Sequence, residues 1–87
     1  MVNSLECLEA IDCLIRAKKA ARAGLGIRDI TKPLVRMRIP RQWNPNHLAR
    51  AHKIAVEIEP ALRRFESSPT RNMGLRRIYP LVEMYQK

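Results

Sequence analysis

The sequence is poor in the residues that large cores, phosphate loops and membrane spans require. Only 5% of its 87 residues are aromatic and only three are glycine, so a core built from it is mostly aliphatic. No apolar run approaches the roughly 20 residues that a bilayer-spanning helix needs. There is also no glycine-rich phosphate loop and no paired-carboxylate motif. These absences argue against a membrane protein and against an enzyme.

The cysteines and histidines do not have the spacing of a metal site. Cys7 and Cys13 are separated by five residues, and His47 and His52 lie on another segment. Zinc sites usually place paired cysteines about two to four residues apart. Cys7 is instead expected to be a small buried residue. We therefore predict no metal, no cofactor and no catalytic residues.

Basic residues are concentrated in one region of the chain. Seventeen Lys and Arg against eight acids give a net charge of +9, and residues 16–41 alone hold nine bases against Asp29. Such a concentration creates a field that attracts phosphate. The candidate nucleic-acid-binding residues are Arg16, Lys18, Lys19, Arg22, Arg28, Lys32, Arg36, Arg38 and Arg41.

The first 15 residues have the opposite charge, with three acids and no Lys or Arg. Signal and transit peptides are basic and poor in acids at this position, so the expected location is the cytoplasm.

The segment 45–66 has the clearest helical pattern. Its apolar residues recur at steps of three and four, which places them on one stripe: Leu48, Ala51, Ala55, Ile58, Leu62 and Phe65. Asn44 followed by Pro45 is typical of a helix start. The spacing keeps its phase across Pro60, which favours one kinked helix. The stripe suits the domain core; a homodimer seam is the alternative.

Three further helices are expected, at residues 4–23, 32–38 and 70–86. Thr31 would cap the second of these, and Pro80 would kink the last one. The apolar arc of the first helix includes Leu8, the buried side of the second includes Val35, and Met73 shares an apolar face in the last. The fold class is therefore all-α: one domain, residues 1–87, forming a bundle of three to four helices with Pro-kinked second and last long helices.

Residues Ala20, Gly24 and Ile30 resemble a helix-turn-helix motif over about 20 residues. The motif has a small residue in its first helix, glycine in the turn and a β-branched residue in its second helix. Pro33 departs from the pattern, because it falls inside the second helix. The alternative is a helix end followed by an ordinary loop.

Other residues suit contact with a protein partner. The Ser68-Pro69 pair falls in a polar stretch expected to be a loop, where a prolyl isomerase could act. Trp43, Pro69, Arg76 and Arg77 are the candidate partner contacts.

Two functions fit these features. The first is a small non-enzymatic protein that binds DNA or RNA through residues 16–41. The second is a regulator or inhibitor that docks on an acidic surface of a larger, nucleic-acid-processing enzyme. Arginine, which outnumbers lysine twelve to five, binds phosphate and carboxylate alike, so composition does not separate the two.

Overall fold

A computed structural model describes residues 3–66 and 68–84, and these residues form a small all-α bundle, as predicted. The helices are α1 (Ser4–Arg22), α2 (Ile27–Arg36), α3 (Pro45–Arg63) and α4 (Pro69–Glu83). The described residues contain no strand.

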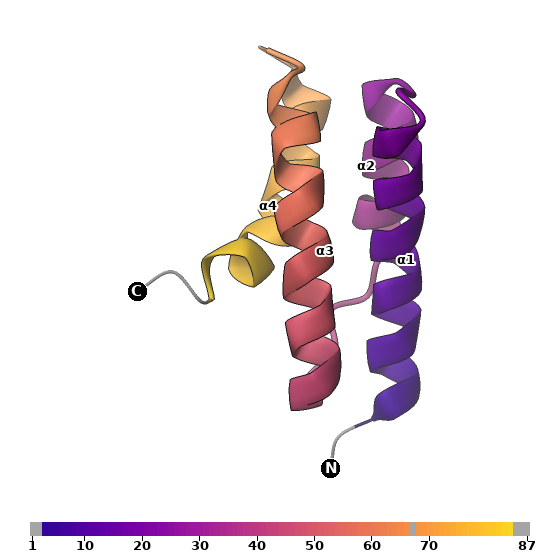
Figure 1. Cartoon of the computed structure of the whole chain (residues 1–87), viewed down its shortest axis with the longest axis vertical. Helices are drawn as coiled ribbons and strands as arrows, with labels where there is room; N and C mark the ends of the chain where they lie inside the picture. The colour runs from indigo at the N-terminus through magenta and orange to yellow at the C-terminus, as the bar shows by residue number, and fades with distance from the viewer. Residues whose placement is uncertain (1–2, 67, 85–87) are drawn as a thin grey trace.

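The helices pack as two antiparallel hairpins set side by side. In Figure 1, α1 and α3 run in the same direction at the front, and α2 and α4 return behind them. The packed pairs are α1 with α2, α3 with α4, α1 with α3, and α2 with α4. The core therefore lies along the line where all four helices meet.

The turn between α1 and α2 is the one the sequence indicates. Gly24 has a φ of 71°, in the left-handed region that glycine favours. Its N–H donates to the Ala21 carbonyl at 3.1 Å, and the Leu25 N–H donates to the Ala20 carbonyl at 3.1 Å. These two bonds form a Schellman motif, which satisfies the last carbonyls of α1.

The helix-turn-helix expectation is wrong beyond this turn. Ala20 and Ile30 are buried, as the motif requires. However, α2 runs back along α1 and the two helices form a hairpin (Figure 1). A DNA-reading second helix would cross the first at about 90–120°.

The second helix begins earlier than predicted, at Ile27 rather than at residue 32, and ends at Arg36. Thr31 does not cap it. The Thr31 side chain is buried within the helix, and its hydroxyl donates to the Ile27 carbonyl at 2.9 Å. Pro33 lies inside α2, where it leaves the Asp29 carbonyl without its intrahelical donor. Asp29 is exposed, so water can reach that carbonyl.

Both long proline-containing helices are continuous. α3 passes through Pro60 and ends at Arg63, three residues before the predicted end. α4 passes through Pro80 and bends toward its C-terminal end (Figure 1). The predicted end of this helix at residue 86 lies outside the described residues.

The Ser68-Pro69 pair is a helix start and not the expected loop. The Ser68 hydroxyl accepts from the Arg71 N–H at 3.4 Å, and Pro69 is the first residue of α4. Proline suits this position because its missing N–H would have no intrahelical partner there.

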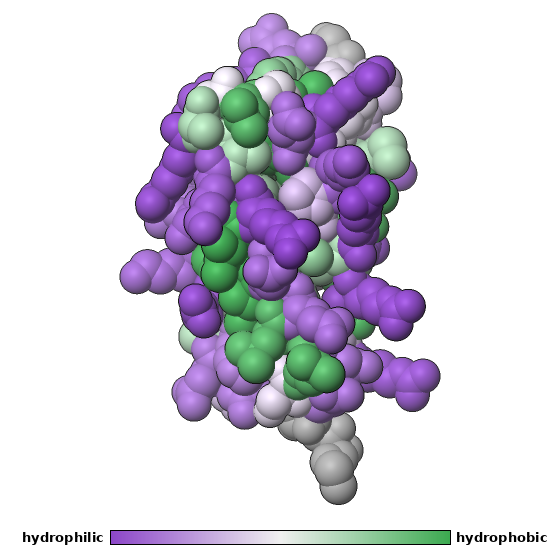
Figure 2. All heavy atoms as spheres, turned by 90° about the vertical axis from the view of Figure 1, so that its right-hand side faces the viewer, coloured by the Kyte–Doolittle hydropathy of each residue, from purple (hydrophilic) through white to green (hydrophobic). Residues whose placement is uncertain are grey.

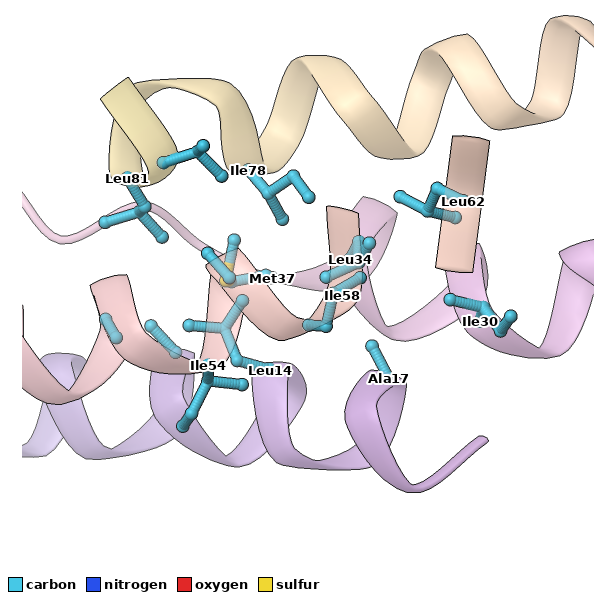
Figure 3. Packing of buried hydrophobic residues seen from close by; sticks show 14 of the residues in the cluster. Leu14, Ala17, Ile30, Leu34, Met37, Ile54, Ile58, Leu62, Ile78 and Leu81 are labelled. Atoms are coloured by element: carbon cyan, nitrogen blue, oxygen red, sulfur yellow. The ribbon is translucent and has the colours of Figure 1, made fainter. Parts of the chain in front are cut away.

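The core is aliphatic and draws on all four helices, as Figure 3 shows for its central side chains. The predicted stripe of α3 supplies four fully buried residues, Ala51, Ala55, Ile58 and Leu62. Leu48 and Phe65, at the ends of the stripe, are half-buried against the core.

Three apolar residues expected in the core are exposed instead: Leu8 (46%), Val35 (45%) and Met73 (51%). Leu8 lies outside the buried face of α1, which is formed by Cys7, Ala10, Ile11, Leu14, Ala17 and Ala20. It lies two turns before Ile15, which is itself only partly buried, so both residues are at the edge of that face.

α4 packs closely against α2 and α3 at Gly74. A Cβ atom at this position would lie 2.7 Å from Thr31 Cγ2 and 3.2 Å from Leu62 Cδ1. Gly74→Ala should therefore lower the free energy of unfolding by about 1–3 kcal/mol, although alanine favours helices. Adding Thr31→Ser removes the clashing methyl group, and the double variant should recover part of the loss. Urea denaturation would measure both; a stabilising Gly74→Ala would contradict the close approach.

Candidate functional site

A groove between α1 and α3 gathers basic side chains from both helices. It has a volume of about 390 Å³. Its lining comprises Lys18, Lys19 and Arg22 with Ile15 from α1, and Arg50, Lys53 and Glu57 with Ile54 from α3. The groove is thus a strip of apolar surface between two basic helix faces.

The electrostatics of the groove are strongly positive. Five cations against one acid, Glu57, give a formal charge of +4. Arg22 Nη2 lies 3.2 Å from Glu57 Oε2, so that acid already has a cationic partner. The other four cations form no salt bridge with any described residue. A concave surface lined by one sign of charge raises the local concentration of anions.

The helical period explains why these residues converge. On α1, Lys18 and Arg22 are four residues apart, and on α3, Arg50, Lys53 and Glu57 follow at steps of three and four. Each set therefore occupies one helix face, and the parallel packing of α1 and α3 brings the two faces together. Arg64, two turns beyond Glu57, lines an adjoining cavity with Lys18 and Arg22.

Only three of the nine predicted binding residues lie in this groove. Arg16, Lys32 and Arg36 line a different cavity, of about 270 Å³, between α1 and α2. Asp29 lies in that cavity, and Arg16 Nη2 is 3.0 Å from Asp12 Oδ2. Arg28, Arg38 and Arg41 are exposed and line neither cavity. Residues 16–41 therefore do not form one surface.

Arg50 and Lys53 were missed because they lie outside the basic run. Their spacing with Glu57 and Arg64 could have identified them, because residues at steps of three, four and seven form a charged stripe on a helix.

Cys13 shares the cavity between α1 and α2 with these charged residues. Partial burial raises the pKa of its thiol, and the nearby Asp12 carboxylate raises it further against the opposing effect of Arg16. A raised thiol pKa lowers the fraction of reactive thiolate at neutral pH. Cys7 is fully buried, as predicted.

A second, more apolar pocket contains three of the four candidate partner contacts. Trp43, Arg76 and Arg77 line it together with Ile39, Pro80 and Leu81, and its volume is about 120 Å³. The fourth candidate, Pro69, begins α4 and is not part of this pocket.

Arg77 is held by hydrogen bonds within the protein. Its Nε donates to the Leu34 carbonyl at 3.0 Å, and its Nη2 donates to the Met37 carbonyl. Both carbonyls lie at the C-terminal end of α2, where carbonyls have no i+4 donor within the helix. The Leu34 carbonyl also accepts from the Met37 N–H at 3.3 Å. Arg77 therefore ties α4 to the end of α2, whereas Arg76 is exposed.

The two adjacent arginines should consequently differ in their contribution to stability. Arg77→Ala leaves two part-buried carbonyls without a charged donor, and it should cost about 1.5–3 kcal/mol. Arg76→Ala removes the same charge and should change stability by less than about 0.5 kcal/mol. Urea denaturation of both variants provides the comparison, and equal losses would contradict the internal role of Arg77.

His52 also has a structural contact. Its Nδ1 lies 2.6 Å from the Leu81 carbonyl oxygen, which can only accept, so Nδ1 carries the proton. This bond joins α3 to the last turn of α4. Within residues 3–66 and 68–84, no group of three His, Cys, Asp or Glu residues is arranged to hold a metal ion.

The groove between α1 and α3 contains no aromatic side chain among its lining residues. Tyr79, on α4, is engaged elsewhere: the Arg63 guanidinium lies 5.6 Å from its ring centroid and donates to its hydroxyl. The hydrogen bond to Tyr79 raises the pKa of the Arg63 guanidinium, and the nearby Glu59 carboxylate raises it to a smaller extent. The lining of the groove therefore provides positive charge but no aromatic side chain on which a base could stack.

None of the helices described here has the length and hydropathy to cross a membrane. No protein-family model, curated protein or solved structure matches this chain. The surface chemistry of the described residues is therefore the basis for inferring a function.

Proposed function

We propose that the protein binds nucleic acid by holding backbone phosphates in the groove between α1 and α3. The observation that carries this proposal is the charge of the groove: five cations from two helices face one acid, and that acid is paired with Arg22. Lysines and arginines that are not neutralised by the protein are available to phosphate.

The chemistry of the lining favours binding that depends weakly on sequence. Phosphate contacts fix the position of a protein on nucleic acid but do not read bases. Stacking requires aromatic side chains, and the groove has none among its lining residues. Most of the affinity should therefore be electrostatic.

Fluorescence anisotropy at several salt concentrations tests the proposal. A labelled mixed-sequence duplex and a single strand of the same sequence serve as ligands. Each neutralised phosphate contributes about −0.9 to the slope of log affinity against log salt on a duplex. With four cations free of salt bridges, the slope should reach about −3.6. The absence of binding to either ligand at low salt would overturn the proposal.

The alternative function uses the same side chains. Carboxylates on an acidic protein surface would pair with the groove cations as phosphates do, which would suit a regulator or inhibitor docked on a larger enzyme. A pull-down from lysate with and without nuclease separates the two, because only nucleic-acid-dependent capture is lost on nuclease treatment.

A further inference from the structure

The N-terminal half of α1 has an exposed face that is both apolar and acidic. Leu5, Leu8, Glu9 and Asp12 are spaced at i, i+3, i+4 and i+7, so they share one side of the helix. Leu5 is 63% exposed and Leu8 is 46% exposed. Figure 2, which views this side of the molecule, shows a band of hydrophobic side chains bordered by hydrophilic ones. We call these four residues the acidic ridge.

The acidic ridge differs from the rest of the surface. Residues 1–15 hold three acids and no Lys or Arg, whereas the chain as a whole carries +9. Asp12 is paired with Arg16 at 3.0 Å, so the available acid of the ridge is Glu9, which forms no salt bridge with any described residue. Exposed apolar side chains that cluster beside charges are typical of protein-binding surfaces.

The pocket between α4 and the α2–α3 linker (residues 37–44) has properties complementary to those of the acidic ridge. Its apolar lining is Ile39, Trp43, Pro80 and Leu81. Its volume of about 120 Å³ is close to that of apolar cavities of about 150 Å³ that accept benzene, so it suits one aliphatic side chain. Exposed Arg76 lines the pocket and forms no salt bridge with a described residue. We call this the Trp43 pocket.

We propose that the occupant of the Trp43 pocket is the acidic ridge of a second copy of the chain. A leucine of the ridge would enter the pocket while Glu9 of the same copy pairs with Arg76. A segment that fits the Trp43 pocket needs an apolar side chain to fill it and an acid to pair with Arg76. The acidic ridge has exposed leucines and an acid on one helix face. Charge complementarity of this kind selects the partner and orients it.

The proposed contact joins two different surfaces. The acidic ridge belongs to α1, and the Trp43 pocket belongs to the linker and α4. When such a contact is made only once between two copies, it is heterologous, and it repeats head to tail as a ring or an open filament. One helix face and one small pocket bury less than the roughly 1,000 Å² of a stable interface, so association is weak and depends on concentration.

Head-to-tail contact would also make binding to a nucleic-acid strand cooperative. This consequence rests on the proposed nucleic-acid function, whereas self-association itself does not. The test is therefore carried out on the full chain without nucleic acid.

Sedimentation velocity over a range of protein concentrations measures the association. The sedimentation coefficient should rise with concentration at low salt and rise less at high salt, because the contact contains charges. Glu9→Lys and Arg76→Glu should each weaken association by about tenfold or more, since like charges then face each other. Glu66→Lys, an exposed residue outside both surfaces, makes the same charge change as Glu9→Lys and should associate as the wild type does.

Mixing the two variants gives the decisive result. A 1:1 mixture of Glu9→Lys and Arg76→Glu should associate again, because the lysine of one copy faces the glutamate of the other and the unaltered surfaces also match. Leu8→Gln alone should weaken association without a change of charge. A wild type that stays monomeric at every concentration, or a mixture that does not recover, would overturn the proposal.

Discussion

Replacing Leu62 with alanine should lower the free energy of unfolding by about 2–5 kcal/mol. Leu62 is fully buried in α3, within the core shown in Figure 3. Its Cδ1 atom lies beside Gly74 of α4, where the two helices approach closely. Truncation to alanine removes buried methyl groups and leaves a cavity that a tightly packed core fills only in part.

The loss would be large for a protein of this size. Domains are stable by about 0.05–0.15 kcal/mol per residue, which corresponds to about 4–13 kcal/mol here. Two substitutions on the same helix serve as controls. Val56→Ala, at a residue that is 43% exposed, and Arg63→Ala, at an exposed residue, should each cost less than about 1 kcal/mol. Urea denaturation compares the three variants, and similar losses would show that the helix faces are assigned wrongly.

The helices that could be predicted are those specified by local sequence. The Asn44-Pro45 pair starts α3, and the three-and-four spacing through Leu62 identifies its buried face. Asn3 likewise caps α1, accepting from the Leu5 N–H at 3.0 Å. Caps and periodicity act within a few residues, so they can be read without knowledge of the fold.

The start of α2 could not be predicted because it depends on tertiary contacts. Gly26, its N-cap residue, supplies no side-chain hydrogen bond, whereas Thr31 has the chemistry of a cap. Thr31 is buried instead, with its methyl group facing Gly74 of α4. The exposure of Leu8 could not be predicted either, because the width of the buried face of α1 depends on how the other helices pack against it.

The sequence predicted a site made of basic residues, but only three of the nine predicted residues lie in the groove. A basic run is continuous in sequence, but successive residues of a helix point about 100° apart, so the run divides between two sides of α1. Arg50 and Lys53 join from α3, and their proximity to α1 depends on how the hairpins pack. Arg77 is a residue type that binds anions, but its guanidinium donates hydrogen bonds to carbonyls at the C-terminal end of α2.

Removing three groove cations should have the largest effect on nucleic-acid binding. Changing Lys19, Arg50 and Lys53 together to glutamine removes three of the four groove cations that form no salt bridge with a described residue. If each contacts one phosphate, the slope of log affinity against log salt on a duplex should become less negative by up to about 2.7. Arg22 is left unchanged so that Glu57 keeps its partner.

A second triple variant controls for net charge. Arg28, Lys32 and Arg36 are exposed residues of α2, and changing them to glutamine also lowers the formal charge from +9 to +6. The α2 triple should shift the salt slope by less than about one unit, because these residues lie outside the groove. Equal shifts would mean that phosphate binds to the general positive surface, and the groove between α1 and α3 would then lose its assignment.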